Sequence, residues 1–232
     1  MHRRAFVDLD AIRQTALAST TSLPDCTADL RADAYGHGLI PVARTLTDAG
    51  VGGFLVSRIE DAAAIADDGI PTRVIVGDPA SGPLLGPELF GLDPTHRHPA
   101  AMRLEAEIVA VKRIAAGRGV SYGYTYHTER PTTLVLVSLG YADGILRVAS
   151  NRAPVLVGGT RGRITGRIAM DQFVVDIGDA QARLGDPVVV FGDEGRGEPT
   201  VLEWADAIGV AAPVITSRLG RRIERVYERP DV

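Results

Sequence analysis

Residues 31–38 read RADAYGHG, and this stretch decides the fold because of what stands on either side of it. The short run at 28–31 predicts a strand, and residues 39–49 predict a helix in which Pro41 is acceptable within the first turn. A polar, glycine-containing stretch therefore joins the carboxyl end of a strand to the start of a helix. Barrels built from α/β units place their active groups at such strand ends.

The same alternation of strand and helix extends over the first hundred residues or so. Short apolar runs separated by helical segments are typical of a parallel βαβ series. We therefore expect an α/β domain with at most four inner strands. The expected strands span residues 5–9, 28–31, 53–56 and 73–77, and the expected helices span 10–22, 39–49 and 59–68.

The pattern changes to an alternation of apolar and polar residues from residue 106 onward. Closely spaced strands with glycine-rich turns predict an antiparallel β domain, a barrel in this case. The expected strands span 107–114, 132–137, 153–157, 163–168, 173–177 and 186–191, followed by a helix at 202–208 and a last strand at 221–227. We therefore place one domain at residues 1–98 and a second at 99–232.

The composition excludes several classes of protein. The 232 residues are 45% hydrophobic with a net charge of −4, which is ordinary for a globular chain and gives no general attraction to nucleic acid. One cysteine, Cys26, excludes a disulfide framework and a cysteine-based zinc site, and we expect no metal. No apolar run approaches the roughly 18–20 residues of a membrane span. Because no apolar core follows the basic start, we expect a cytoplasmic protein without a membrane partner.

Arginine has almost completely replaced lysine in this chain. The 25 basic residues are 24 arginines and one lysine, Lys112. A mechanism that needs a lysine amine therefore has one candidate side chain, because arginine is not deprotonated in proteins. Lys112 falls in an expected strand of the β domain, where we expect a solvated surface charge.

Four motifs, in the right order, resemble the alanine racemases. They are residues 31–43, VSYG at 120–123 with GYADG at 140–144, GRIAMDQ at 166–172 with LGDPV at 184–188, and RLGRRIERVY at 218–227. The resemblance implies a TIM barrel that binds pyridoxal phosphate (PLP), followed by a β domain. It also implies a homodimer, because this family builds each active site from two subunits.

The resemblance also implies catalytic roles. In the family, a lysine at the position of Arg31 forms an imine with PLP and moves the α-proton on one face of the substrate. A tyrosine of the partner subunit, which matches Tyr141, acts on the other face. Without the resemblance, Tyr141 is equally an aromatic packed where a strand meets a turn, and Asp143 is a turn residue.

Further residues match the family's binding positions. Tyr35 matches the tyrosine that reaches the cofactor phosphate, although a loop aromatic that closes the barrel end is an equal interpretation. Gly86 matches a backbone contact to the same phosphate. Met170 and Asp171 match a substrate-side loop whose backbone helps to hold the substrate carboxylate. His37, between two glycines, is expected to be a turn residue.

Three departures from the family pattern bear on function. A guanidinium at position 31 forms no imine and carries no proton back and forth near neutral pH. A tyrosine of the family that precedes the closing motif falls on Pro213. A TIM barrel needs typically about 200–250 residues, far more than precede the β domain here. We therefore expect an incomplete, truncated barrel fragment whose open edges are covered by the β domain, a second copy or a partner.

These departures predict an alanine-racemase-like protein with a degenerate PLP site. It is expected to lack ordinary racemisation and to have a binding or accessory role for a small amino-acid-like ligand, or repurposed chemistry without PLP. The alternative is a residual racemase that converts L-alanine to D-alanine with PLP held non-covalently. A further possibility is that the chain pairs with a full-length racemase paralogue and donates Tyr141 to its barrel.

Overall fold

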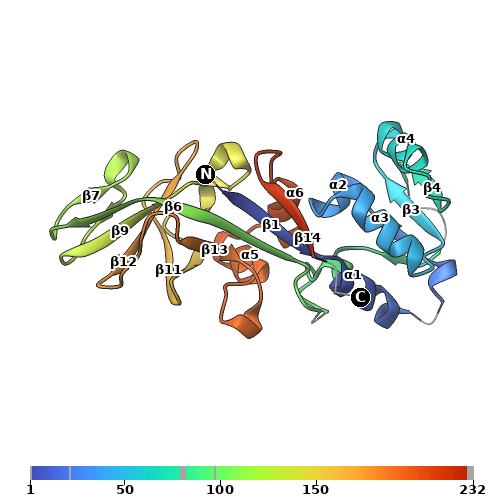
Figure 1. Cartoon of the computed structure of the whole chain (residues 1–232), viewed down its shortest axis with the longest axis horizontal. Coiled ribbons are helices and arrows are strands. Elements are labelled where there is room, and N and C mark those ends of the chain that lie inside the picture. Colours follow the sequence, from blue (N-terminus) through green and yellow to red (C-terminus); the bar gives the residue numbers. More distant parts are fainter. Residues whose placement is uncertain (1, 21, 79–81, 97, 229–232) are drawn as a thin grey trace. The chain divides into compact units, whose positions relative to one another are not determined.

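The computed structural model describes residues 2–20, 22–78, 82–96 and 98–228. The chain forms two compact units. The first, here called the β unit, comprises Met1–Ala5 and Arg103–Glu224, and the second, the α/β unit, comprises Phe6–Met102 and Arg225–Val232. Each unit is described by itself below (Figure 1).

The β unit is built around a closed antiparallel barrel. Its six strands follow the order β13-β10-β11-β12-β9-β6, and a further pairing of β13 with β6 closes the ring. The strands are β6 (Met102–Ile114), β9 (Thr132–Val137), β10 (Pro154–Val157), β11 (Thr160–Thr165), β12 (Phe173–Gly178) and β13 (Pro187–Phe191). Two further strands, β1 (Arg3–Asp8) and β14 (Glu224–Glu228), each include residues of both units. The expected antiparallel barrel is confirmed.

Alternation along these strands supplies the barrel core. In β12, for example, Phe173, Val175 and Ile177 are buried, whereas the residues between them are half-buried. Trp204 is buried edge-on to Phe191, with 6.1 Å between ring centroids, and its indole nitrogen donates to the carbonyl oxygens of Pro154 and Val190, each at 2.8 Å. The buried aromatic ring therefore keeps its polar atom paired.

Short elements complete the β unit. They are β7 (Gly119–Val120), β8 (Tyr126–His127), α5 (Val201–Ile208), α6 (Ala212–Ser217) and the 3₁₀ turns Tyr122–Tyr124, Tyr141–Asp143, Arg147–Ala149 and Glu194–Arg196. Helix α6 is absent from the sequence-based expectation. Pro213 stands in its first turn, where a missing N–H is tolerated.

The α/β unit contains a four-stranded parallel sheet in the order β4-β3-β2-β5. Its elements are β2 (Thr27–Asp29), β3 (Gly53–Val56), β4 (Arg73–Val76), β5 (Leu84–Leu85), α1 (Leu9–Ser19), α2 (Arg31–Tyr35), α3 (Leu39–Asp48), α4 (Ile59–Asp67) and the 3₁₀ turns Leu23–Asp25 and Pro87–Phe90. Every residue of β2 and β3 is buried. Four strands do not close a barrel, so the expected incomplete barrel is confirmed.

The bounds of several elements differ from the expectation. The strand expected at 28–31 is β2, which ends at Asp29 and leaves Arg31 in α2, and the strand expected at 221–227 is β14, which begins at Glu224. The strand expected at 5–9 is β1, which is not one of the four strands of the parallel sheet and comes next to β6 in the strand order of the other sheet. The strand expected at 163–168 is β11, three residues earlier, because Gly158 and Gly159 have positive φ and form a two-residue hairpin turn that pairs Val157 with Thr160. The helix expected at 10–22 is α1 and ends at Ser19, with residue 21 outside the described part.

Candidate functional site

A single turn of left-handed helix follows β2 and carries the residues of the RADAYGHG stretch. The four residues Ala32–Tyr35 have φ angles between 51° and 59°. This conformation costs a non-glycine residue about 1–2 kcal/mol, and backbone strain of this kind clusters at functional sites. The Gly36 amide closes the turn by donating to the carbonyls of Ala32 and Asp33, at 2.9 and 3.0 Å.

The carboxylate of Asp29 is the centre of a hydrogen-bonded cluster on this turn. The Nε of Arg31 donates to Oδ1 at 2.8 Å, and the terminal nitrogen NH2 donates to Oδ2 at 2.6 Å. The Tyr35 hydroxyl donates to the same Oδ2 at 2.7 Å. The Asp29 side chain is 2% exposed. Arg31, at the family's lysine position, thus forms a two-point ion pair with Asp29.

The three groups stabilise one another's charge states. Burial opposes ionisation of Asp29, but the hydrogen bonds from Arg31 and Tyr35 outweigh it, so the pKa of the carboxyl is below its usual value. The hydrogen bond to Asp29 raises the pKa of Arg31 above its usual value. Burial, together with the bond to the carboxylate, raises the pKa of Tyr35. The cluster therefore consists of a guanidinium, a carboxylate and a neutral phenol at neutral pH.

Two further groups surround this cluster within the α/β unit. The Gly86 amide donates to the Glu88 carboxylate at 2.7 Å, and a Cβ built on Gly86 would lie 3.9 Å from the Tyr35 hydroxyl. His37 is fully buried against the Phe90 ring, with 4.5 Å between ring centroids. Its Nδ1 lies 3.0 Å from the Ala34 carbonyl, and its Nε2 has no partner among the described residues.

A second cluster surrounds Tyr141 in the β unit. The Tyr141 amide donates to the Ala169 carbonyl at 3.0 Å, and the next amide donates to the Met170 carbonyl at 2.9 Å. Only glycine fits at position 140, because a Cβ there would lie 2.3 Å from the Met170 carbonyl oxygen. The Tyr141 ring is 41% exposed, and the Arg147 guanidinium lies 5.6 Å from its centroid. The loop thus presents a phenol beside a cation.

The buried carboxylate of Asp143 stabilises this second cluster. Asp143 is fully buried and accepts hydrogen bonds from the Gly140 amide and from Nε of Arg222, both at 2.8 Å. The same Arg222 side chain donates to the exposed Asp171 carboxylate at 2.8 Å, and Arg3 lies 3.5 Å from Asp143. The loop at 140–144 and the loop at 169–172 are therefore tied by both backbone and side-chain bonds.

Sequence comparison assigns both units to one family. The sequence profile described as alanine racemase, N-terminal domain, matches residues 7–87, and the profile for the C-terminal domain of the same enzyme matches residues 101–227. The chain belongs to the alanine racemase family. The second profile alone covers more than half of this chain.

Individual alanine racemases agree with that assignment. The enzyme of Thermobifida fusca is 50% identical over 145 residues, which is 62% of this chain and 37% of that protein. The enzyme of Streptomyces coelicolor is 47% identical over 163 residues, or 70% of this chain and 38% of that protein. The crystal structure of alanine racemase from Streptomyces lavendulae matches with a TM-score of 0.92 at 27% identity, covering 99% of this chain and 97% of that one. The sequence matches span about two fifths of the curated relatives' length.

The racemase-like residues fall into two groups. Arg31, Tyr35 and Gly86 lie together in the α/β unit, and the three remaining expected site residues, Tyr141, Met170 and Asp171, lie together in the β unit. The lone lysine, Lys112, is exposed on β6 of the β unit, as expected.

Sequence reasoning missed two acids that contact the expected site residues. Asp29 stands two residues before Arg31, and Glu88 stands two residues after Gly86. The available signal was therefore an acidic residue two positions away from a hydrogen-bond donor. Among the described residues, no group of three or more His, Cys, Asp or Glu side chains is placed to hold a metal ion. No helix within the described ranges has the length and apolar character to cross a bilayer.

Proposed function

We propose that this member of the alanine racemase family does not carry out PLP-dependent racemisation by itself and has a binding or accessory role for a small amino-acid-like ligand. The observation that carries the proposal is the two-point ion pair between Asp29 and Arg31. A guanidinium forms no imine with an aldehyde, and this guanidinium is also held by a buried carboxylate.

The residues at the family's phosphate-binding positions support the same proposal. The Tyr35 hydroxyl donates a hydrogen bond to Asp29, and the Gly86 amide donates one to Glu88, so both donors are occupied by carboxylates of this chain. A phosphate brought to these atoms would displace a hydrogen bond and meet negative charge at short range. We therefore infer that the residues present do not fit PLP, and we assign no chemical step to the cofactor.

The test is to mix the purified chain with PLP and reduce the mixture with borohydride. We expect the absorbance of free PLP and no stable pyridoxyl adduct by intact-mass analysis. A Lys112→Arg variant is the matched control, because it removes the one lysine side chain and leaves position 31 unchanged.

A racemase assay tests the alternative of a residual racemase with non-covalent PLP. We expect no D-alanine above the amount that free PLP produces. Formation of D-alanine that follows protein concentration and disappears in a Tyr141→Phe variant would overturn the proposal.

The intact Tyr141 loop favours a second role for the same chain. The bonds from Gly140 and Arg222 to buried Asp143 hold this loop without any contribution from PLP. We propose that the loop is available to a second subunit, either another copy in a homodimer or a full-length racemase paralogue whose barrel would receive Tyr141. Light scattering tests for the homodimer, and co-purification from the source cell tests for the complex with a full-length racemase. A monomer that captures no racemase would contradict this role.

The open parallel sheet also supports association. The edge strand β4 is only partly covered, and its Val76 is 43% exposed. Sheet edges with unpaired backbone groups are normally covered by another element or chain. A second subunit at this edge would satisfy those groups, which gives the proposed dimer a structural reason.

A further inference from the structure

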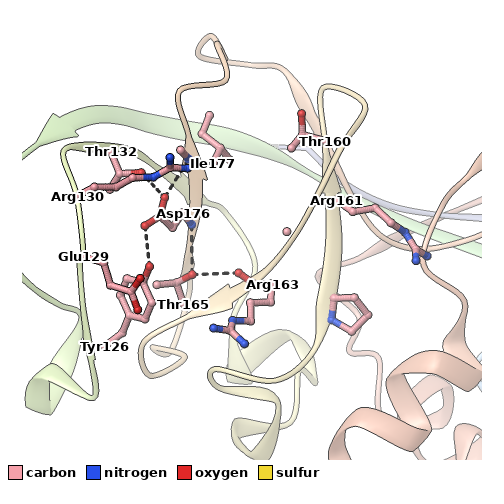
Figure 2. A pocket seen from close by; sticks show the side chains of 13 residues that line it. Tyr126, Glu129, Arg130, Thr132, Thr160, Arg161, Arg163, Thr165, Asp176 and Ile177 are labelled. Carbon is pink, nitrogen blue, oxygen red and sulfur yellow. Dashed lines mark hydrogen bonds between the residues drawn. The ribbon is translucent and has the colours of Figure 1, made fainter. Parts of the chain in front are cut away.

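A pocket of about 640 Å³ opens on the β unit among residues that have no part in the proposed function. Figure 2 shows it lined by the segment that leads from β8 to β9 and by β11 and β12. Its polar side chains come from three segments that the barrel brings to one place. This convergence places hydroxyl, carboxylate and guanidinium groups around one space.

Asp176 forms a fixed anion in this pocket. Its carboxylate accepts hydrogen bonds from the Tyr126 hydroxyl at 2.8 Å, from the Gly178 amide at 2.9 Å and from the Thr132 hydroxyl (Figure 2). Burial and the bond to Asp176 raise the pKa of Tyr126 to about 12, so this phenol stays protonated and remains a donor. Three neutral donors thus hold the charge of Asp176 without cancelling it, and one of roughly four acceptor positions is left open.

Two arginines line the same pocket with their charges uncommitted. Arg130 and Arg163 form no ion pair among the residues that the structure describes, whereas Arg161 donates to both carboxylate oxygens of Glu203. The Arg130 charge also acts on the exposed Asp179, which is paired with Arg113. The Arg163 charge acts on the Tyr126 hydroxyl, and NH2 of Arg130 lies 3.3 Å from a Cβ built on Gly178. Both cations therefore lie close to the Asp176 network.

The fourth charged group is Glu129, whose exposed side chain also lines the pocket. The pocket thus offers two uncommitted cations, Arg130 and Arg163, and two carboxylates, Glu129 and Asp176. A ligand with only negative charge would be attracted by the two arginines and repelled by the two carboxylates. A ligand with both charges would gain from all four groups.

We propose that this pocket binds a small zwitterion that carries a carboxylate and an ammonium group, the chemistry of a free α-amino acid. The ligand carboxylate accepts from one of the two guanidinium groups, which Figure 2 shows on opposite sides of Asp176, because a planar guanidinium matches carboxylate geometry. The ammonium donates to Glu129 and to the open acceptor position of Asp176. The inference stands apart from the proposed function, since no hydrogen bond or ion pair in the described part of the chain joins these four side chains to the Asp29 or Tyr141 clusters.

The test is a titration of the isotope-labelled full chain with glycine, followed through its backbone amide NMR signals. We expect saturable shifts confined to residues 126–132, 160–165 and 176–178, with affinity in the millimolar range because the arginines are exposed. Acetate, methylamine and inorganic phosphate each carry one kind of charge and are expected to bind on the order of tenfold more weakly. One of the two variants Arg163→Gln and Arg130→Gln is expected to weaken glycine binding by on the order of tenfold, and the other by less.

Arg118→Gln is the matched control, because Arg118 is an exposed arginine of the same unit outside the pocket. It should leave glycine binding unchanged. Absence of saturable shifts in the pocket would overturn the proposal. Equal binding of phosphate or acetate and glycine would also overturn it, because the carboxylates would then have no role. A loss of binding in Arg118→Gln equal to that in both pocket variants would do the same.

Discussion

The side chains of Asp29 and Arg31 meet at two points, with Nε to Oδ1 at 2.8 Å and NH2 to Oδ2 at 2.6 Å. The two residues lie at the end of β2 and the start of the left-handed turn, so this pair is built locally. It gives the position of the family's lysine a different chemistry. A buried carboxylate requires a cation there, and arginine supplies one that never loses its proton.

Restoring lysine alone should therefore not restore amine reactivity. In Arg31→Lys the new ammonium faces Asp29, which raises the lysine pKa and leaves little free amine. After reduction with borohydride, we expect the double variant Asp29→Ala, Arg31→Lys to carry on the order of tenfold more pyridoxyl group than Arg31→Lys alone. Intact-mass analysis in a Lys112→Arg background measures this, because position 31 then carries the one lysine. Equal trapping by the single and double variants would contradict the inhibitory role of Asp29.

The Asp143 carboxylate should be a major contributor to the stability of the β unit. Asp143→Asn weakens the hydrogen bonds that this buried carboxylate accepts from Gly140 and Arg222, and because Arg222 is itself partly exposed the cost should be about 1–3 kcal/mol of unfolding free energy. Asp171→Asn removes the exposed partner of the same arginine and should cost less than about 1 kcal/mol. Urea unfolding of both variants measures the difference. Similar losses of unfolding free energy in the two variants would show that burial does not increase the contribution of Asp143 to stability.

Gly38 is expected to be irreplaceable for two separable reasons. Its φ is +99°, and a Cβ there would lie 2.0 Å from the Tyr227 hydroxyl oxygen, whereas Gly50 has φ +93° with nothing within 4 Å. Gly50→Ala should cost about 1 kcal/mol for the backbone alone. Gly38→Ala should cost about 1–3 kcal/mol more, because of the contact.

Thermal or urea unfolding checks this difference. Tyr227→Phe removes the hydroxyl oxygen and leaves Cζ, 3.1 Å from the built Cβ, as the nearest ring atom. Part of the loss in Gly38→Ala should therefore be recovered in that background. Failure of Tyr227→Phe to recover any stability would mean that the backbone strain alone sets the cost.

Strands with one buried face were the most predictable part of this fold. The segment at 173–177 alternates buried and half-buried residues and is found as β12, and the strand expected at 53–56 is β3 without change. The strand at the N-terminus was placed in the wrong sheet, because its neighbour β6 begins about a hundred residues later and nothing local reports that pairing. The two-residue strand β5 is too short to give any pattern.

The candidate site was predictable in position but not in conformation. The motif located Tyr35 correctly after a strand, but Arg31 was expected as the last residue of that strand and lies beyond its end at Asp29. Ala and Tyr do not ordinarily favour positive φ, so the left-handed turn has no sequence signature. The partners of Asp143 were hidden for a different reason, because Arg222 lies 79 residues further along the chain. Charge pairs of that separation depend on tertiary structure.

The buried His37 should make the stability of the chain sensitive to mildly acidic pH. Burial lowers the pKa of His37 from 6.5 to about 4, so the unfolded chain takes up a proton at a higher pH than the folded chain does. The contribution of neutral His37 to the free energy of unfolding is complete above pH 6.5. It is lost as the pH falls from 6.5 towards 4, by a total of about 3 kcal/mol. Asp29 acts in a lower window, because its lowered pKa gives a contribution that is lost only as the pH falls below its usual value of 3.8.

Urea unfolding at a series of pH values between 4 and 7 separates these effects. His37→Phe keeps a ring against Phe90 and removes the titrating group, so the slope of stability against pH should flatten between 6.5 and 4 even if the absolute stability falls. His127→Gln changes an exposed histidine and should leave the slope unchanged. An equally steep slope in His37→Phe would place the acid sensitivity elsewhere, since the buried imidazole would then contribute nothing to it.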